Sequence, residues 1–164
     1  MRFLIRRYSS IDAASTLAVF RRSVLALAAH DYAPEQVRAW AGHTEDVRQW
    51  DLRRLAVDTW VVVPEADDGT LAGFIDVDAN GYINMLYVDP DHARQGAALT
   101  LLAEVERHAA EHGMTSLSVH ASITARPFFE HHGFRVMQVR HPSIGSVSFV
   151  NYRMVKTGIP DNDT

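Results

Sequence analysis

The segment 83–98 constrains the fold most, because it carries a short apolar stretch, a proline and then a run of small residues. The apolar stretch predicts a buried strand that ends near Val88, since Pro90 has no N–H to give to a strand ladder. A helix is expected to begin near Arg94 and to stop at Gly113. Leu99, Leu102, Val105, Glu106 and Ala109 follow helical spacing, with Leu101 beside them. The segment therefore predicts a strand, a turn and a helix N-terminus in close succession.

The turn before this helix has the properties of an anion-binding site. The first N–H groups of a helix have no partner within the helix, and the helix dipole places partial positive charge there. Gly96, Ala97 and Ala98 are small enough for a pyrophosphate to approach the backbone, and Arg94 adds a positive charge. The spaced glycines of a dinucleotide fingerprint and the Gly-Lys-Ser/Thr of a P-loop are both absent. The same small residues fit close helix packing equally well, so both interpretations stay open at this point.

Length and composition fit one domain with a full hydrophobic core. The chain has 164 residues, of which 47% are apolar and 22% are charged. Residues 1–157 are expected to form this domain, and residues 158–164 are expected to be a frayed C-terminal tail. No segment reaches the roughly 18 consecutive apolar residues of a membrane-spanning helix. We therefore expect a cytoplasmic protein without a membrane partner.

Charge and cysteine content exclude several classes of function. Sixteen basic and twenty acidic residues give a net charge of −4 without a Lys/Arg-rich run, so nucleic acid is not expected as a partner. Cys is absent, which excludes a disulfide scaffold, a thiolate zinc site and a cysteine nucleophile. His108 and His112 have a spacing that can hold a metal, but no third ligand is evident, so we expect solvated helix surface and no metal.

The first half of the chain predicts helices followed by a strand meander. A strand at residues 3–7 precedes helices that are expected at 13–28, 34–42 and 45–55. Turn signals then follow at 67–69 and at Asn80-Gly81, and each predicts a hairpin. Together the two hairpins predict three consecutive antiparallel strands.

The second half adds strands beyond the long helix. They are expected at 116–120, 134–140 and 147–155, with a short helix that ends at Gly133 and a turn at 142–145. Consecutive strands, one crossover helix and a strand beyond it predict an α/β fold with a mixed sheet and helices on both faces. This order excludes a doubly wound parallel sheet.

The order of the elements and three segments resemble the GNAT (Gcn5-related) N-acetyltransferase family. The segments are 86–90 (LYVDP), the turn that contains Gly96, and 125–134 (ARPFFEHHGF). The resemblance covers nearly the whole chain. It implies a single-domain, mostly antiparallel mixed sheet of about six to seven strands, with a splayed central parallel pair and flanking helices. It also implies that acetyl-CoA gives its acetyl group to an amine acceptor, a small molecule or a peptide amine, by direct attack on the thioester.

The resemblance also implies where coenzyme A binds. The phosphate turn of the family aligns with residues 93–98, where Gly96 and Ala98 match and Ala93 replaces the usual Arg or Gln. In this family the strand that matches 85–88 splays from the strand that matches 116–120, and the pantetheine arm enters the gap between them. The coenzyme A contacts implied by the resemblance are Leu86, Tyr87, Val88, Arg94, Gln95, Gly96, Ala97, Ala98, Ser122 and Phe129.

Two of the family's usual proton-transfer residues are replaced in this chain. Phe129 stands where a tyrosine often protonates the leaving thiolate, and positions 82 and 84 lack the Glu that relatives often use as base. An alkylamine with a pKa of about 10.4 is almost fully protonated at pH 7, so removing its proton costs roughly 4 to 5 kcal/mol. The remaining candidate bases are Asp76, Asp78, His120 and Tyr87.

Among these candidates His120 is favoured. Its unperturbed pKa is about 6.5, and it is expected at the C-terminal end of a parallel strand. A lone histidine at a strand end is, however, more often a solvated side chain. Asp76 and Asp78 share one strand face, which fits a solvent-facing surface as well as an amine-binding pocket.

The acceptor is expected to contact Tyr32, Asp76 and Asn84. Trp40, Trp50 and Trp60 are expected to lie mostly in the core, because aromatic residues at helical spacing usually do. A non-catalytic acyl-CoA-binding module that regulates a protein partner is the alternative function, because the usual Glu and Tyr are missing. The sequence identifies no acceptor and is compatible with a homodimer.

Overall fold

The computed structural model describes residues 2–42, 46–66 and 69–160. Its helices and strands, in chain order, are β1 (Phe3–Arg7), α1 (Ala13–Leu27), α2 (Pro34–Gly42), α3 (Val47–Leu55), β2 (Asp58–Pro64), β3 (Gly73–Val77), β4 (Tyr82–Ile83), β5 (Leu86–Val88), α4 (Ala97–Glu111), β6 (Ser116–Ser122), α5 (Arg126–His131), β7 (Arg135–Arg140), β8 (Ser143–Ile144), β9 (Val147–Ser148) and β10 (Asn151–Thr157). Short 3-10 turns lie at η1 (Ser10–Asp12), η2 (Ala28–His30) and η3 (Pro90–His92).

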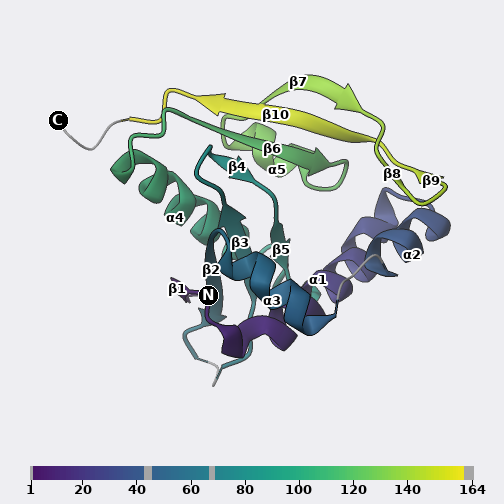
Figure 1. Cartoon of the computed structure of the whole chain (residues 1–164), viewed down its shortest axis with the longest axis horizontal. Helices are drawn as coiled ribbons and strands as arrows, with labels where there is room; N and C mark the ends of the chain where they lie inside the picture. Colours follow the sequence, from purple (N-terminus) through teal and green to yellow (C-terminus); the bar gives the residue numbers. More distant parts are fainter. Residues whose placement is uncertain (1, 43–45, 67–68, 161–164) are drawn as a thin grey trace.

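The strands form two four-stranded sheets and one small hairpin (Figure 1). The first sheet has the order β1-β2-β3-β5, and all its pairs are antiparallel. The second has the order β4-β6-β10-β7, in which β4 and β6 are parallel and the other pairs are antiparallel. Consecutive strands β4 and β5 connect the two sheets. The predicted mixed, mostly antiparallel arrangement with one parallel pair is confirmed.

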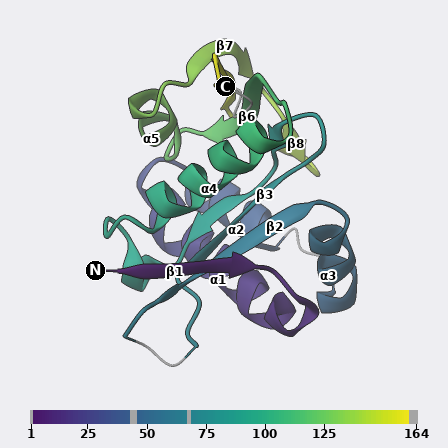
Figure 2. The same cartoon turned by 90° about the vertical axis from the view of Figure 1, so that its left-hand side faces the viewer.

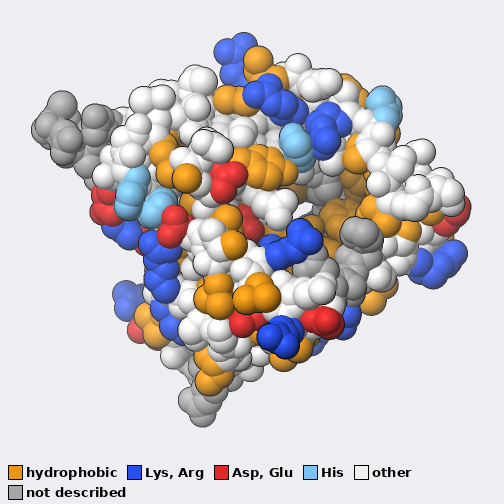
Figure 3. Space-filling view, in the orientation of Figure 1, with side chains coloured by type: hydrophobic (Ala, Val, Ile, Leu, Met, Phe, Trp, Pro, Cys, Tyr) orange, Lys and Arg blue, Asp and Glu red, His pale blue; other side chains and the backbone are white. Residues whose placement is uncertain are grey.

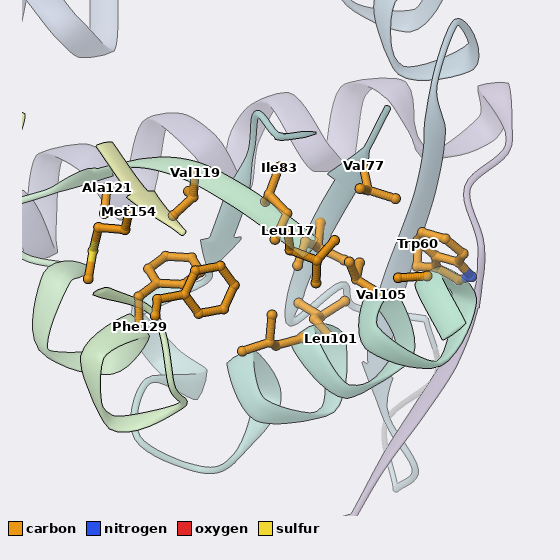
Figure 4. Close-up of a cluster of buried hydrophobic side chains, with 14 of the residues drawn as sticks. Trp60, Val77, Ile83, Leu101, Val105, Leu117, Val119, Ala121, Phe129 and Met154 are labelled. Carbon is orange, nitrogen blue, oxygen red and sulfur yellow. The ribbon is translucent and has the colours of Figure 1, made fainter. Parts of the chain in front are cut away.

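Helices cover both sides of this arrangement (Figures 1 and 2). Helix α4 packs against β1, β2, β3 and β5, and α5 packs against β6 and β7. Helix α1 packs against β3 and β5 on the opposite side and contacts α2 and α3. Two hydrophobic clusters result. One lies under α4 and α5 and includes Leu101, Val105, Leu117, Phe129 and Met154 (Figure 4), and the other lies under α1 to α3 and includes Phe20, Trp50 and Phe74.

The long helix begins later than predicted. Helix α4 starts at Ala97 rather than near Arg94, because Arg94 and Gly96 both have a left-handed backbone, with φ of 61° and 93°. The turn therefore extends to Gly96, which is the N-cap residue. Leu99 was predicted on the apolar face, but its side chain is 50% exposed. The predicted positions Leu101 and Val105 are buried, as are Leu102 and Ala109.

The prediction that His108 is solvated is wrong. Its side chain is buried against β2, with the ring 5.0 Å from that of Trp60. Its Nε2 lies 3.2 Å from Oδ2 of Asp58, which satisfies the buried ring nitrogen. His112 is exposed, as predicted, and its Nδ1 shares a 2.8 Å hydrogen bond with the carbonyl oxygen of His108.

The end of the chain is more ordered than predicted. Ile159 falls in the predicted frayed tail, yet it is buried, and its N–H donates to the carbonyl oxygen of Thr115 at 3.1 Å. Residues 161–164 lie outside the described residues, as does the 67–68 part of the first predicted hairpin turn. The antiparallel pairing of β2 with β3 confirms that hairpin. Within the described ranges, none of the helices has the length and apolar character needed to cross a membrane.

Candidate active site

The site begins at a bend in the chain between β4 and β5. One carboxylate oxygen of Asp76, on β3, accepts hydrogen bonds from the N–H groups of Asn84 and Met85, both at 2.9 Å. These two residues leave the strand ladder, so the chain changes direction there. As a result β4 pairs with β6, whereas β5 pairs only with β3 and diverges from β6. The bend therefore opens a gap between β5 and β6.

Backbone groups on both strands face this gap. The carbonyl oxygen of Met85 accepts a hydrogen bond from β3, and the N–H of Asp89 donates to the residue that precedes β3. Because a strand alternates its backbone direction, the N–H and C=O groups of Leu86 and Val88 point the other way, toward the gap. On β6 the N–H of Ser118 bonds to Gly81, so the backbone groups of His120 face the same gap. An extended ligand can therefore pair with β5 as an additional strand.

Two cavities, of about 290 and 720 Å³, meet at the gap. The walls of both include Trp40, Leu86, Tyr87, Ser122 and Ala125. The residues that they share lie on β5, at the end of β6, just before α5 and on α2. The two cavities therefore adjoin at the gap. Figure 3 shows a hollow in one face of the molecule.

The larger cavity is bounded by the turn before α4. Arg94, Gly96, Ala97 and Ala98 line it, together with the C-terminal half of α1. The N-cap residue of α4, Gly96, has no side chain that could accept from the first N–H groups of the helix, so these groups can bind an anion. A Cβ added to Gly96 would meet nothing within 4 Å, so the left-handed backbone, not crowding, favours glycine there.

Most of the predicted coenzyme A contacts lie in this cavity. They are Leu86, Tyr87, Val88, Arg94, Gly96, Ala97, Ala98 and Ser122. The structure places Phe129 in the wall of the smaller cavity instead, where it is 1% exposed and packs on Phe134. Gln95 is exposed and lines neither cavity.

The smaller cavity contains a tyrosine and histidine pair. The hydroxyl of Tyr82, on β4, and Nδ1 of His120, on β6, share a hydrogen bond of 3.1 Å. Burial lowers the pKa of His120, and the nearby guanidinium groups of Arg140 and Arg153 lower it further. Burial raises the pKa of the Tyr82 hydroxyl. At neutral pH the pair therefore consists of a neutral imidazole and a protonated phenol, which together can accept one proton.

Tyr32 and Asn84 also line the smaller cavity, as expected for acceptor contacts. The Tyr32 hydroxyl donates to the carbonyl oxygen of Val150 at 2.8 Å and accepts from the N–H of Ile123 at 2.9 Å. Both bonds connect the wall to the end of β6 and to the residue before β10. Tyr32 therefore offers the cavity its ring more than its hydroxyl.

Asp76 and Tyr87 differ from the roles predicted for them. Asp76 is 1% exposed, lines neither cavity and is engaged with the bend, so the solvent-facing alternative does not hold for it. Burial raises the pKa of the Asp76 carboxyl, although the hydrogen bond from the Met85 N–H and the charge of Arg54 both act to lower it. Tyr87 lines both cavities, but burial raises the pKa of its hydroxyl, which suits a proton donor better than a base.

Several residues of the site carried no clear signal in the sequence. The three tryptophans were expected to lie mostly in the core. Trp50 and Trp60 are buried there, whereas Trp40 lines both cavities. Tyr82 was noted only for lacking a carboxylate, and its partnership with His120 depends on the parallel pairing of β4 and β6. Arg140 ends an ordinary strand pattern, and only the pairing of β7 with β10 places it at the cavity.

Comparison with known proteins agrees with this geometry. A family model for the acetyltransferase (GNAT) domain matches residues 28–156. The chain is similar to YafP of Escherichia coli (strain K12), an uncharacterized N-acetyltransferase, with 35% identity over 150 residues that cover 92% of this chain and 93% of YafP.

Solved structures show the same fold. A GCN5-related N-acetyltransferase from Rhodopseudomonas palustris has a TM-score of 0.89 and 31% identity, with 96% of each chain covered. The PaiA N-acetyltransferase from Thermoplasma acidophilum, solved in complex with coenzyme A, has a TM-score of 0.77 and 21% identity, over 96% of this chain and 99% of that one. With the family model and the relatives in agreement, the chain belongs to the GNAT family of acetyltransferases.

Proposed function

We propose that the chain acetylates its amine acceptor by direct attack on acetyl-CoA in the gap between β5 and β6, with His120 accepting the amine proton. Membership of the family makes the chain an acetyl-CoA-dependent N-acetyltransferase. The observation that carries the proposal is the pair of cavities that adjoin at the gap, one lined by the turn before α4 and the other by His120.

Coenzyme A enters from the larger cavity. Its pyrophosphate is held by the N–H groups at the start of α4, with Arg94 beside them. This arrangement needs no side chain at Ala93, because the backbone supplies the donors. The pantetheine arm continues along β5, where it pairs with the free backbone groups of Leu86 and Val88. The acetyl group then reaches the smaller cavity.

The transfer requires one base and an oxyanion donor. The amine nitrogen attacks the thioester carbonyl carbon, the C–N bond forms, and the C–S electron pair leaves with sulfur as the coenzyme A thiolate. The Leu86 N–H stabilises the oxyanion that develops on the carbonyl oxygen. The amine proton passes to His120, either directly to Nε2 or through the Tyr82 hydroxyl to Nδ1, according to the tautomer.

The leaving thiolate needs little help. Phe129 cannot donate a proton, and it is packed into the core. A thiol with a pKa of about 8.5 leaves as a thiolate at modest cost near neutral pH. The Ser122 hydroxyl oxygen accepts from the N–H of Ala125 at 3.0 Å, which leaves its hydrogen free to donate to the sulfur. Ser122 lines both cavities and therefore lies where they adjoin.

Asp76 acts as a positioning residue in this proposal. Its carboxylate fixes the bend that separates β5 from β6, and it has no contact with the cavities. The gap, and with it the exposed Leu86 N–H, depends on that bend.

Free-thiol release with a panel of small amines, amino acids and peptides tests the proposal. H120Q should lower kcat by about 10²- to 10⁴-fold while acetyl-CoA binding is unchanged, because only proton transfer is lost. The matched control is H141Q, which changes an exposed histidine just beyond β7 and should leave kcat unaltered. Full activity of H120Q would remove His120 from the mechanism. Acetyl-CoA binding without thiol release from any amine would instead favour an acyl-CoA-binding module.

The Y82F variant separates the two proton routes. If the proton passes directly to Nε2 of His120, Y82F should keep most of the activity. If it passes through the phenol, Y82F should lose as much as H120Q, since both break the same relay.

A further inference from the structure

The smaller cavity has a distinctive charge. Of the described residues that line it, Arg140 is the only Lys, Arg, Asp or Glu, and the other polar side chains there are hydroxyls, amides, the Trp40 indole and the imidazole of His120. An acceptor that enters this cavity therefore meets one guanidinium and no carboxylate. This is the opposite of what a cationic acceptor would need.

The guanidinium of Arg140 is held without a carboxylate. Its Nη1 donates to the side-chain oxygen of Asn151 at 3.1 Å, across the β7 to β10 pair. Within the described residues no acidic side chain lies within 4.0 Å of it. Since a guanidinium has five donors in a fixed fork, one amide contact leaves most of its capacity for a ligand.

Arg140 is also close to the base. It belongs to a row of the second sheet that includes Asn151 and Ser122, and the row of His120 and Arg153 lies two residues along the strands, on the same face of the sheet. Its charge lowers the pKa of both His120 and Tyr82. Both side chains line the smaller cavity, so an acceptor whose amine is at His120 has the guanidinium available in the same cavity for a second group.

The rest of the wall is aromatic. Tyr32, Trp40, Tyr87 and Phe149 line the same cavity, and their rings contact one another at centroid distances from 5.5 to 6.4 Å. The cavity volume of about 290 Å³ is at the lower end of the range for small-molecule sites. The site therefore suits a small acceptor with an apolar part.

We infer that the acceptor is an α-amino acid with an aromatic or large apolar side chain, whose carboxylate pairs with Arg140 while its amine is acetylated at His120. This inference rests on the proposed function, because it identifies the acceptor of the same reaction. The carboxylate forms a bidentate ion pair with the guanidinium, and the side chain packs on the aromatic wall. The product keeps its carboxylate and loses the positive charge of the amine. Polyamines and lysine side chains bring additional positive charge next to Arg140 and are poor acceptors.

Matched acceptors test the inference. L-phenylalanine is compared with 2-phenylethylamine, which lacks only the carboxylate, and spermidine serves as a cationic acceptor. With saturating acetyl-CoA, kcat/KM from thiol release should be about 10- to 100-fold higher for L-phenylalanine than for 2-phenylethylamine, the effect expected of one charged hydrogen-bonding group. Spermidine should be the poorest of the three.

Variants of Arg140 locate the effect. R140M should bring the ratio of the two kcat/KM values to about 1, R140K should give an intermediate ratio, and R135M should leave it unchanged. Arg135 is an exposed arginine at the other end of the same strand and lines neither cavity. Because each ratio is measured within one variant, a general loss of activity does not alter it.

Calorimetric titration of L-phenylalanine into the protein saturated with coenzyme A gives a readout that is independent of turnover. Binding that weakens about 10- to 100-fold in R140M but not in R135M supports the inference. Preference of the wild type for 2-phenylethylamine or spermidine, or an unchanged ratio in R140M, overturns it while leaving the proposed function intact. Thiol release from none of the amines would overturn the proposed function itself, whereas absence of L-phenylalanine binding alone overturns only this inference.

Discussion

Removing the Asp76 carboxylate should both destabilise the protein and close its active site. The two N–H groups of Asn84 and Met85 would lose their acceptor, and the buried guanidinium of Arg54 would lose a carboxylate whose Oδ2 lies 3.9 Å from its Nε. The side chains of Asp76 and Arg54 are almost fully buried, with 1% and 3% of their surface exposed. Removing one member of a buried charged pair typically costs about 3 to 5 kcal/mol.

The magnitude translates into a measurable change in Tm. For a chain of this length each kcal/mol shifts Tm by about 2 to 4 °C, so D76A should lower Tm by about 6 to 20 °C. D78A is the matched control, because Asp78 also accepts from two backbone N–H groups, those of Asn80 and Tyr82, but is only half-buried. Its loss should cost about 1 kcal/mol, or about 2 to 4 °C.

The assay pairs thermal unfolding with acetyl-CoA binding, measured at a temperature where D76A is still folded. D76A should lose affinity for acetyl-CoA because β5 no longer diverges from β6, and D78A should bind normally. D76N, which keeps an oxygen for the two N–H groups, should fall between D76A and wild type in both properties. Equal Tm values for D76A and D78A, or binding of acetyl-CoA by D76A as tight as that by wild type, would show that Asp76 does not hold the bend.

Three further predictions concern the turn, the base and the buried histidine. G96A and G113A each place a Cβ on a left-handed backbone with open space around it, and each should lower Tm by about 2 to 8 °C. Only G96A should also weaken acetyl-CoA binding, measured by titration calorimetry. The acidic limb of the pH profile of kcat/KM should have its midpoint below about pH 6.5, because burial, Arg140 and Arg153 lower the pKa of His120 beside Tyr82. R153Q should move that limb to higher pH, and an unmoved limb would show that the charge of Arg153 does not lower this pKa. Burial also lowers the pKa of His108, so the unfolded chain binds this proton more readily, and stability should be lost as pH falls below about 6.5. Urea unfolding at pH 7 and pH 5 should show a smaller loss for H108N than for wild type, and the same loss as wild type for H141Q, which changes an exposed histidine.

The order of the elements was predictable because local signals agree with the fold. Proline and glycine mark real boundaries, as at Pro34, Gly42 and the Asn80-Gly81 turn, where the chain changes direction in the structure. The turn before α4 was predictable for the same reason, since small residues before a helix are a local property. The left-handed backbone at Arg94 was not, because a positive φ at a residue other than glycine gives no signal in composition.

The chemistry of the site depends on pairing between distant strands. His120 could be proposed from its residue type and its place at the end of a strand. Its hydrogen bond to Tyr82, 38 residues away, follows only from the register of β4 on β6. For Asp76 the sequence was compatible with a solvent-facing surface or an amine-binding pocket, whereas the bend at Asn84 and Met85 makes its carboxylate a backbone acceptor.

A crystal structure of the protein with acetyl-CoA would locate the coenzyme and its acetyl group. We expect the pyrophosphate at the first N–H groups of α4 and the pantetheine arm along β5. The thioester oxygen should lie about 3 Å from the N–H of Leu86, with the acetyl carbon facing the Tyr82 and His120 pair across the smaller cavity. An acetyl group that points away from His120, or a coenzyme that does not pass between β5 and β6, would refute the proposed mechanism.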